Sequence, residues 1–587
     1  MNTWKSIISA ALLITAAAVG QQNPAATNAK PATMQAVSSS EKTPSVTPAT
    51  VKSAPVAASP MTMEQVVDRT IQREHALMSL LRTRTPLVET YLQNLKRDSE
   101  LGAVPKDDRY FLGRLDLAAA VERRDYLSKD ESFEKNLLGG FGKLFKLEYN
   151  PMGFSWMIFA DRDDFDRSHY EFKYIRREFL GDVRCFVFDV TPRKDAGKGR
   201  FLGRIWVEDE DFNIVRLNGT YAPRPKNAYF FHMDSWRLNL IPGYWLPAYI
   251  YSEEGDFSYD SRDKFAFKAQ TRIWGYDLKK KTHENELAQI TVDSVKDESP
   301  TAADPSPLAA QREWQQQAED NVIERLEAAG LLAPVGDVDK ILSTVVNNLI
   351  VTNNIDLPGQ VRTRVMLTSP LETFSVGNTI AVSRGLIDVL PDESCLAMVL
   401  SHELAHIVLG HNLGSKFAFT DRMLFSDQAT YQNFGFRHSP EEETAADAKA
   451  LEMLKKSPYA DKLDSASLFL KELSARAPQL PALLTPHLGN SFANDKGQLV
   501  RMTALTTSGP ELKPDRLDQI AALPLGGRLK VNPWDDQVEL VKAAPVTLLS
   551  ARDKMPFEVT PFFPHLTRME NGNAVATTTA ANRSPQK

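Results

Sequence analysis

The sequence SCLAMVLSHELAHIVLG, residues 394–410, has the composition of a buried helix, whose only charged or titratable side chains besides Cys395 are His402, Glu403 and His406. Helical residues four apart share a face, so both histidines can direct a ring nitrogen at one metal ion. Burying these polar groups without a partner is costly, and a metal offsets that cost. Glu403 lies one step round the helix, where a general base acting on water belongs. The alternative, a surface helix with an incidental pattern, conflicts with the apolar flanks, so we expect one zinc ion per chain.

A third metal ligand is expected downstream, because catalytic zinc takes three protein ligands and keeps one position open. The stretch EEETAAD, residues 441–447, opens a helix with small side chains that could approach the first helix closely. Glu443 and Asp447 share a face of it, which predicts Glu443 as the ligand and Asp447 as the acceptor of a ligand histidine N–H. The two preceding glutamates fit a solvated helix N-terminus. His411 is expected to border the cleft or end its helix.

Three stretches together resemble peptidase family M48, the HtpX-like zinc metallopeptidases, and in particular its soluble periplasmic members. They are residues 374–387, residues 402–411 and the E-x-x-A-D stretch at 443–447. The resemblance implies a mainly helical HExxH zincin domain of the minigluzincin type over residues 335–510. It also implies that the strand containing Thr379, Ile380 and Ala381 pairs with substrate backbone.

Two departures from the family pattern concern the substrate cleft. Glu372 and Thr373 stand where the family has Asn-Ala before that strand. The family's His-Pro pair, followed about six residues later by an arginine that helps to stabilise the oxyanion, is inverted here as Pro486-His487. Arg501 follows fourteen residues later. His487 is therefore the predicted oxyanion partner, and its alternative is an inconsequential loop histidine.

An antiparallel sheet is predicted before the peptidase region. Short runs rich in β-branched and aromatic residues, separated by turn residues, occupy 183–190, 203–208, 214–217 and 236–251. About residues 140–295 resemble the LolA-like lipoprotein-sorting proteins, which implies a curved half-barrel whose concave face holds acyl chains in that family. The alternative is a packed β domain without ligand. The predicted fold class is α+β multidomain.

The N-terminus predicts export. Residues 1–20 combine Lys5, an apolar run over 7–19 and a small-residue cleavage site at 18–20, which is typical of a signal peptide. We therefore expect a periplasmic or otherwise extracytoplasmic protein. No later uncharged run reaches the ~20 residues that a membrane span needs. The net charge of −6 gives nucleic-acid binding no support, and two cysteines exclude a disulfide framework.

These patterns predict a domain organisation in seven parts. They are a signal peptide (1–20), a disordered linker (21–60), a helix plus antiparallel β domain (61–296), a linker and helix (297–334), the peptidase domain (335–510), a C-terminal extension (511–570) and a disordered tail (571–587).

The leading hypothesis is a zinc endopeptidase that hydrolyses exported or envelope proteins. Its role would be quality control, the degradation of misassembled envelope proteins. One alternative is a periplasmic lipid- or lipoprotein-binding or chaperone-like module with a latent or inactive peptidase domain. Another is a peptidase whose cleft is closed by residues beyond 525.

Overall fold

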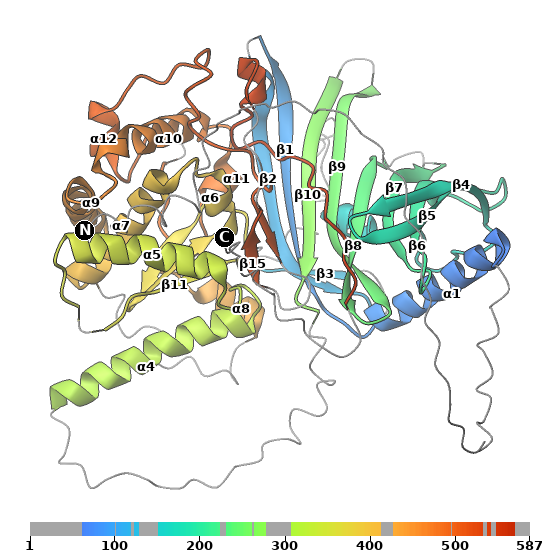
Figure 1. Cartoon of the computed structure of the whole chain (residues 1–587), viewed down its shortest axis with the longest axis horizontal. Coiled ribbons are helices and arrows are strands. Elements are labelled where there is room, and N and C mark those ends of the chain that lie inside the picture. The colour runs from blue at the N-terminus through green and yellow to red at the C-terminus, as the bar shows by residue number, and fades with distance from the viewer. Residues whose placement is uncertain are drawn as a thin grey trace, which may run out of the picture. The chain divides into compact units, whose positions relative to one another are not determined.

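The computed structural model describes residues 61–99, 101–118, 122–127, 151–223, 230–260, 263–276, 307–357, 359–411, 426–494, 496–531, 537–541 and 547–569 (Figure 1). The chain divides into two compact units, Met1–Gln65 and Val66–Lys587, and all the described strands belong to the second. The predicted signal peptide, the linker over 21–60 and the tail over 571–587 lie outside the described residues. Among the described helices, none is long and apolar enough to cross a membrane.

A ten-stranded antiparallel sheet forms the first part of the second unit, in the order β3-β2-β1-β10-β9-β8-β7-β6-β5-β4. The first and last long strands in sequence, β1 and β10, pair in its middle, and the sheet stays open between its edges β3 and β4. This confirms the predicted half-barrel-like antiparallel domain. The strands are β1 Leu87–Asp98, β2 Gly102–Asp116, β3 Glu122–Asp125, β4 Tyr170–Leu180, β5 Val183–Pro192, β6 Arg200–Glu208, β7 Ile214–Ala222, β8 Met233–Ile241, β9 Tyr244–Asp260 and β10 Asp263–Trp274.

One face of this sheet packs against its own helices, α1 (Met63–Leu81) and α3 (Pro151–Trp156) with the residues after it. Arg237 of β8 pairs with Glu74 of α1 at 2.6 Å, and both side chains are 1% exposed. Arg237 also donates to the carbonyl of Ile158 at 3.2 Å. A buried ion pair therefore lies between this face and α1. Binding of lipid or lipoprotein by the β domain stays a prediction.

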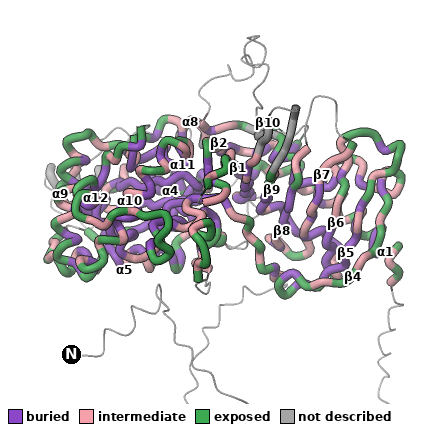
Figure 2. Tube along the Cα trace, turned by 90° about the horizontal axis from the view of Figure 1, so that it is seen from above, coloured by how far each residue is buried: buried purple, intermediate pink, exposed green. Residues whose placement is uncertain are grey.

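The other face packs against the helical part of the same unit, and buried side chains of both belong to one hydrophobic core. Buried residues run along the traces of both parts (Figure 2). Glu89 of β1 accepts N–H from Ser369 at 2.6 Å and pairs with Arg384 at 3.0 Å. Asp108 of β2 accepts the first N–H groups of α11 (Pro481–Leu484), those of Ala482 and Leu483. Buried polar contacts thus join the sheet to the helical part.

The C-terminal strap, residues 557–569, continues across the same face of the sheet. Gln93 of β1 donates to the carbonyl of Phe557 and accepts from Val559 N at 2.9 Å. Further along, Arg568 pairs with Glu208 at 2.7 Å, at the end of β6. The strap therefore runs from β1 to β6. The contacts named here join it to strands of the sheet and not to the predicted catalytic residues.

The helical part surrounds a three-stranded sheet in the order β11-β13-β12. Asp392 caps the helix that carries the two histidines by accepting N–H from Cys395, and Gly410 ends it in a left-handed conformation at φ +69°. The ten-stranded sheet, followed by helices around a small sheet, confirms the predicted α+β architecture with a mainly helical second part. Its helices are α4 Pro307–Ala328, α5 Asp337–Thr352, α6 Arg384–Val389, α7 Glu393–Leu409, α8 Asp427–Asn433, α9 Pro440–Lys455, α10 Leu463–Arg476, α11 Pro481–Leu484 and α12 Thr503–Ser508, and its strands are β11 Arg362–Met366, β12 Thr373–Val376, β13 Thr379–Ser383, β14 Leu529–Val531 and β15 Val538–Leu540.

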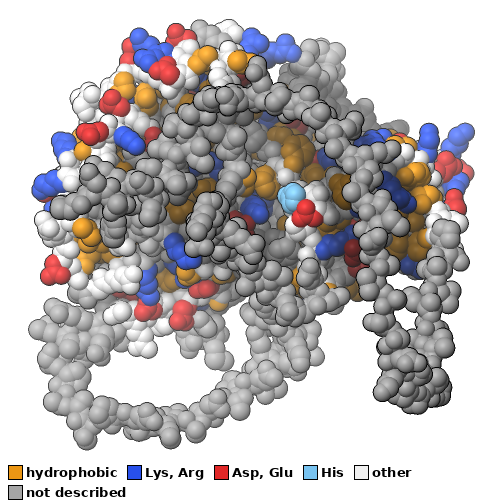
Figure 3. Space-filling view, viewed as in Figure 1, with side chains coloured by type: hydrophobic (Ala, Val, Ile, Leu, Met, Phe, Trp, Pro, Cys, Tyr) orange, Lys and Arg blue, Asp and Glu red, His pale blue; other side chains and the backbone are white. Residues whose placement is uncertain are grey.

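Charge on the surface is mixed. On the face drawn in Figure 3, the described basic and acidic side chains are interspersed.

Candidate active site

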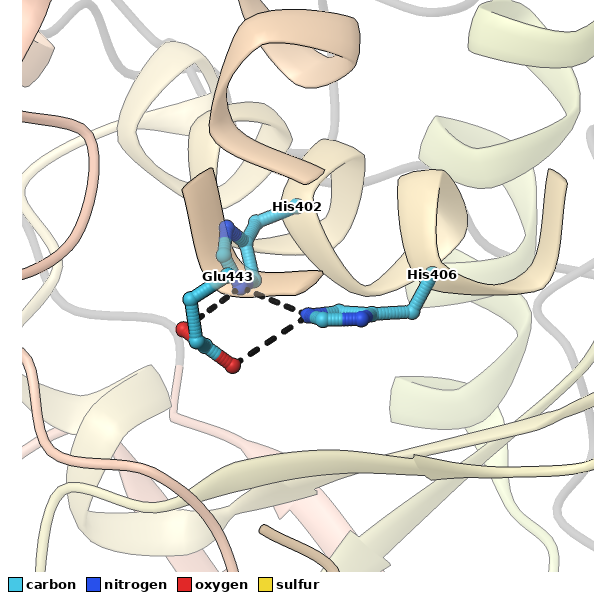
Figure 4. Close-up of side chains that lie close together, drawn as sticks. All are labelled: His402, His406 and Glu443. Carbon is cyan, nitrogen blue, oxygen red and sulfur yellow. Dashed lines mark hydrogen bonds and ion pairs between the residues drawn. The ribbon is translucent and has the colours of Figure 1, made fainter. Parts of the chain in front are cut away.

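Two helices bring three side chains with metal-ligating atoms together (Figure 4). His402 and His406 come from α7 and Glu443 comes from α9, and one ligand atom from each lies within 4.8 Å of the other two. The Nε2 atoms of both histidines lie 3.3 Å from a carboxylate oxygen of Glu443. The two Nε2 atoms are 3.1 Å apart. The three side chains thus converge as the sequence predicts.

Local sequence explains why α9 presents its glutamate here. Ser439 begins α9 with a capping box, and Pro440 stands at its first position. Ala446 and Ala450 are fully buried, so their small side chains allow α9 to pack closely on α7. Glu443 lies in the first turn, 8% exposed, facing α7.

The donor set fits a catalytic zinc ion. Nδ1 of His402 lies 2.8 Å from Asp447 Oδ1, so it donates there and Nε2 carries the lone pair that would bind a metal. Nδ1 of His406 lies 2.9 Å from Nδ1 of His411, which therefore borders the site. Oε2 of Glu443 is buried and accepts no hydrogen bond from the described residues, although polar atoms in protein interiors are rarely left unpartnered. Two imidazole nitrogens and one carboxylate are the ligands expected for such zinc sites.

Arg501 and His438, whose ring stacks on that of His406 with centroids 3.8 Å apart, lie at the site and were not selected from the sequence. Arg501 makes the polar contacts. Its side chain is 2% exposed, and Nη2 donates to Oε1 of the predicted base Glu403 at 2.5 Å. Nε lies 3.1 Å from His402 Nε2. The only sequence signal was an arginine downstream of the third ligand, at a spacing different from that of the family.

The charges around Glu403 keep it ionised. Burial raises the pKa of its carboxyl, but Arg501 and the two histidines outweigh burial and hold that pKa below its ordinary value. The pKa of Glu443 is likewise lowered: burial raises it, and its contacts with His402 and His406 lower it by more. Both carboxylates therefore carry the negative charge that a base and a metal ligand need.

The remaining predicted residues lie elsewhere around the site. The ring of His487 stacks on Tyr431 with centroids 4.4 Å apart, and its Nε2 donates to the Tyr431 carbonyl at 2.7 Å. An oxyanion role for His487 stays a prediction. Residues 379–381 belong to β13, the central strand, which pairs with β11 on one side and β12 on the other. Pairing of this strand with substrate backbone stays a prediction.

Glu372, which directly precedes β12, links this strand to the loop that follows α11. It is 1% exposed and accepts N–H from Leu488 and Gly489. Burial raises the pKa of Glu372 from 4.5 to about 7, although these N–H groups lower it. The folded protein therefore holds this proton more tightly than the unfolded chain does, and stability falls as pH rises through that interval.

Glu372→Gln should remove this pH dependence, because the amide oxygen still accepts both N–H groups but does not ionise. We expect the variant to gain stability over the parent between pH 4.5 and about 7, reaching about 3 kcal/mol above it. Urea unfolding of both proteins across this range measures the difference. Parallel pH profiles for the two proteins would contradict the assignment.

Comparison with known proteins gives one family and several structures. Residues 338–422 match the model of peptidase family M48, a segment that contains α7. No curated protein matches the chain. A LolA superfamily protein from Nitrosomonas europaea is 10% identical, with 37% of this chain and 95% of that chain covered and a TM-score of 0.17. An outer-membrane lipoprotein-sorting protein domain from Vibrio parahaemolyticus is 8% identical, with 37% and 96% covered and a TM-score of 0.17.

The family match and the site rest on the same helix. The matched segment supplies His402, Glu403 and His406, while Glu443 lies beyond its end at residue 422. Residues 338–422 are therefore similar to peptidase family M48, which supports a metallopeptidase.

Proposed function

We propose that this protein is a zinc endopeptidase that hydrolyses peptide bonds within exported or envelope proteins, in a quality-control role. The observation that carries the proposal is the convergence of His402, His406 and Glu443 beside the ionised carboxylate of Glu403. The predicted signal peptide supports action outside the cytoplasm.

The chain's own residues divide the chemistry among them. When bound at the three ligands, zinc supplies Lewis acidity that polarises a carbonyl and lowers the pKa of water. Glu403 takes the proton of the attacking water on its carboxylate and hands it to the leaving amine. Asp447 hydrogen-bonds Nδ1 of His402, and His411 hydrogen-bonds Nδ1 of His406. These contacts fix the orientation of both rings.

Substrate binding is proposed at the three-stranded sheet that holds residues 379–381 and contacts α7 through β12 and β13. A polypeptide in extended conformation can add to an edge strand through main-chain hydrogen bonds, which accepts many sequences. Arg501 lies beside Glu403, where its N–H groups can reach charge that develops on a substrate carbonyl oxygen. We propose Arg501 for this role alongside the predicted His487.

His406→Ala tests the metal site. The variant should lose its zinc and its peptidase activity together, because two ligands seldom retain a catalytic zinc that needs three. Metal analysis of the purified full chain measures this, with His75→Ala on the exposed side of α1 as the control that keeps one zinc ion. A His406→Ala protein that retains stoichiometric zinc would place the metal elsewhere.

A further inference from the structure

Arg501 contacts two of the three proposed metal ligands through one nitrogen. Its Nε lies 3.1 Å from His402 Nε2 and 3.4 Å from Glu443 Oε2. Because Nδ1 of His402 donates to Asp447, Nε2 is the acceptor for the arginine N–H. A lone pair that accepts this hydrogen bond is not available at the same time to a metal ion.

The arginine is held at this place by groups other than the ligands. Nη2 donates to Glu403 at 2.5 Å, and Nη1 donates to the carbonyl of Asn490 at 3.3 Å. The guanidinium lies over the ring of Phe492, 4.9 Å from its centroid. These contacts keep the group beside the ligands even when Nε leaves His402.

The charge of Arg501 adds to this direct competition. A guanidinium stays protonated under all ordinary conditions, so its positive charge cannot be lost to relieve repulsion. At 2% exposure, the side chain has little water to screen it from a divalent cation a few ångströms away. Both the shared lone pair and the repulsion oppose metal binding.

We propose that Arg501 competes with the metal ion for His402 and Glu443 and thereby sets the metal affinity of the site below what the three ligands alone would provide. The inference rests on the proposed function in taking these residues as metal ligands. Zinc at the three ligands would take the Nε2 lone pair of His402 in place of the Nε–H, while the links to Glu403 and Asn490 would keep the guanidinium beside the ligands. The Arg501 guanidinium thus lowers the metal affinity and places a positive charge next to the reacting groups.

The test measures zinc affinity of the full-length protein by competition with a chromophoric chelator at neutral pH. Arg501→Gln and Arg501→Met should each bind zinc about tenfold or more tightly than the parent, because the repulsion and the competing N–H are both removed. The methionine variant keeps an unbranched stem to pack over Phe492. Arg437→Gln is the matched control, because Arg437 donates to the carbonyls of Pro486 and Gly489 instead of to the ligands.

We expect the control to stay within about twofold of the parent, since an exposed charge contributes little. Zinc affinities of both Arg501 variants at or below that of the parent would overturn the inference. If one of the two Arg501 variants is unstable without metal, the zinc affinity of the other variant decides the test. A parent that binds one zinc but cleaves no protein would overturn the proposed function and leave this comparison standing.

Discussion

Glu403→Gln is expected to lower peptide hydrolysis by about a thousandfold while the protein keeps its zinc. The amide cannot accept the proton of the attacking water, and it carries no charge to pair with Arg501. The three proposed ligands are untouched by the substitution, so the metal content should equal that of the parent. Cleavage of a casein-type substrate and metal analysis of the same preparation measure the two quantities.

The matched control for this variant is Glu441→Gln, a neighbouring glutamate that is exposed in the first turn of α9. It should cleave at the rate of the parent, because a solvated carboxylate there only favours the helix N-terminus. A Glu403→Gln protein that cleaves as fast as this control would remove Glu403 from the mechanism. Loss of zinc from Glu403→Gln would instead show that the carboxylate supports the metal.

Arg384→Met is expected to destabilise the protein by about 3–5 kcal/mol, since it breaks the buried ion pairs with Glu89 and Asp388. Arg384 is fully buried in α6 and donates to Glu89 at 3.0 Å and to the Ser369 hydroxyl at 2.8 Å. The substitution leaves the Glu89 carboxylate without its arginine partner between the sheet and the helical part. The free energy of unfolding in urea measures the loss.

Glu89→Gln added to Arg384→Met should recover part of the loss, because the second change removes the stranded charge. The control is Arg204→Met, whose ion pair with Asp189 at 2.7 Å is partly exposed and should contribute less than about 1 kcal/mol. Equal losses for Arg384→Met and Arg204→Met would mean that the buried contact does not join the two parts energetically.

The metal cluster was predictable because its signals are local. His402, Glu403 and His406 lie within one helical turn, and Glu443 and Asp447 lie within another. Arg501 could not be selected in the same way, because it reaches Glu403 across 98 positions and only the fold shows which downstream arginine does so. Its position depends on how the chain after α11 returns to α7.

The antiparallel sheet was predicted from strands that read as apolar and aromatic runs, whereas β1 and β2 gave no such signal. In β1, Glu89 and Gln93 face the helical part and the strap, so polar residues occupy buried positions and mask the alternation. Likewise, the sequence identified residues 379–381 as a strand but could not show that β13 is central, since strand order depends on long-range pairing.

The strap makes the order of synthesis matter. Val559 donates its N–H to Gln93 across 466 positions, so this partner of the sheet is synthesised long after the strand that it contacts. Contacts so distant in sequence form slowly, and an apolar face that waits for them is prone to aggregate. Until the strap arrives, the growing chain presents Trp236 and Tyr249, which Phe563 and Phe562 later contact. A nascent chain stalled short of residue 557 would therefore need a chaperone to remain monomeric.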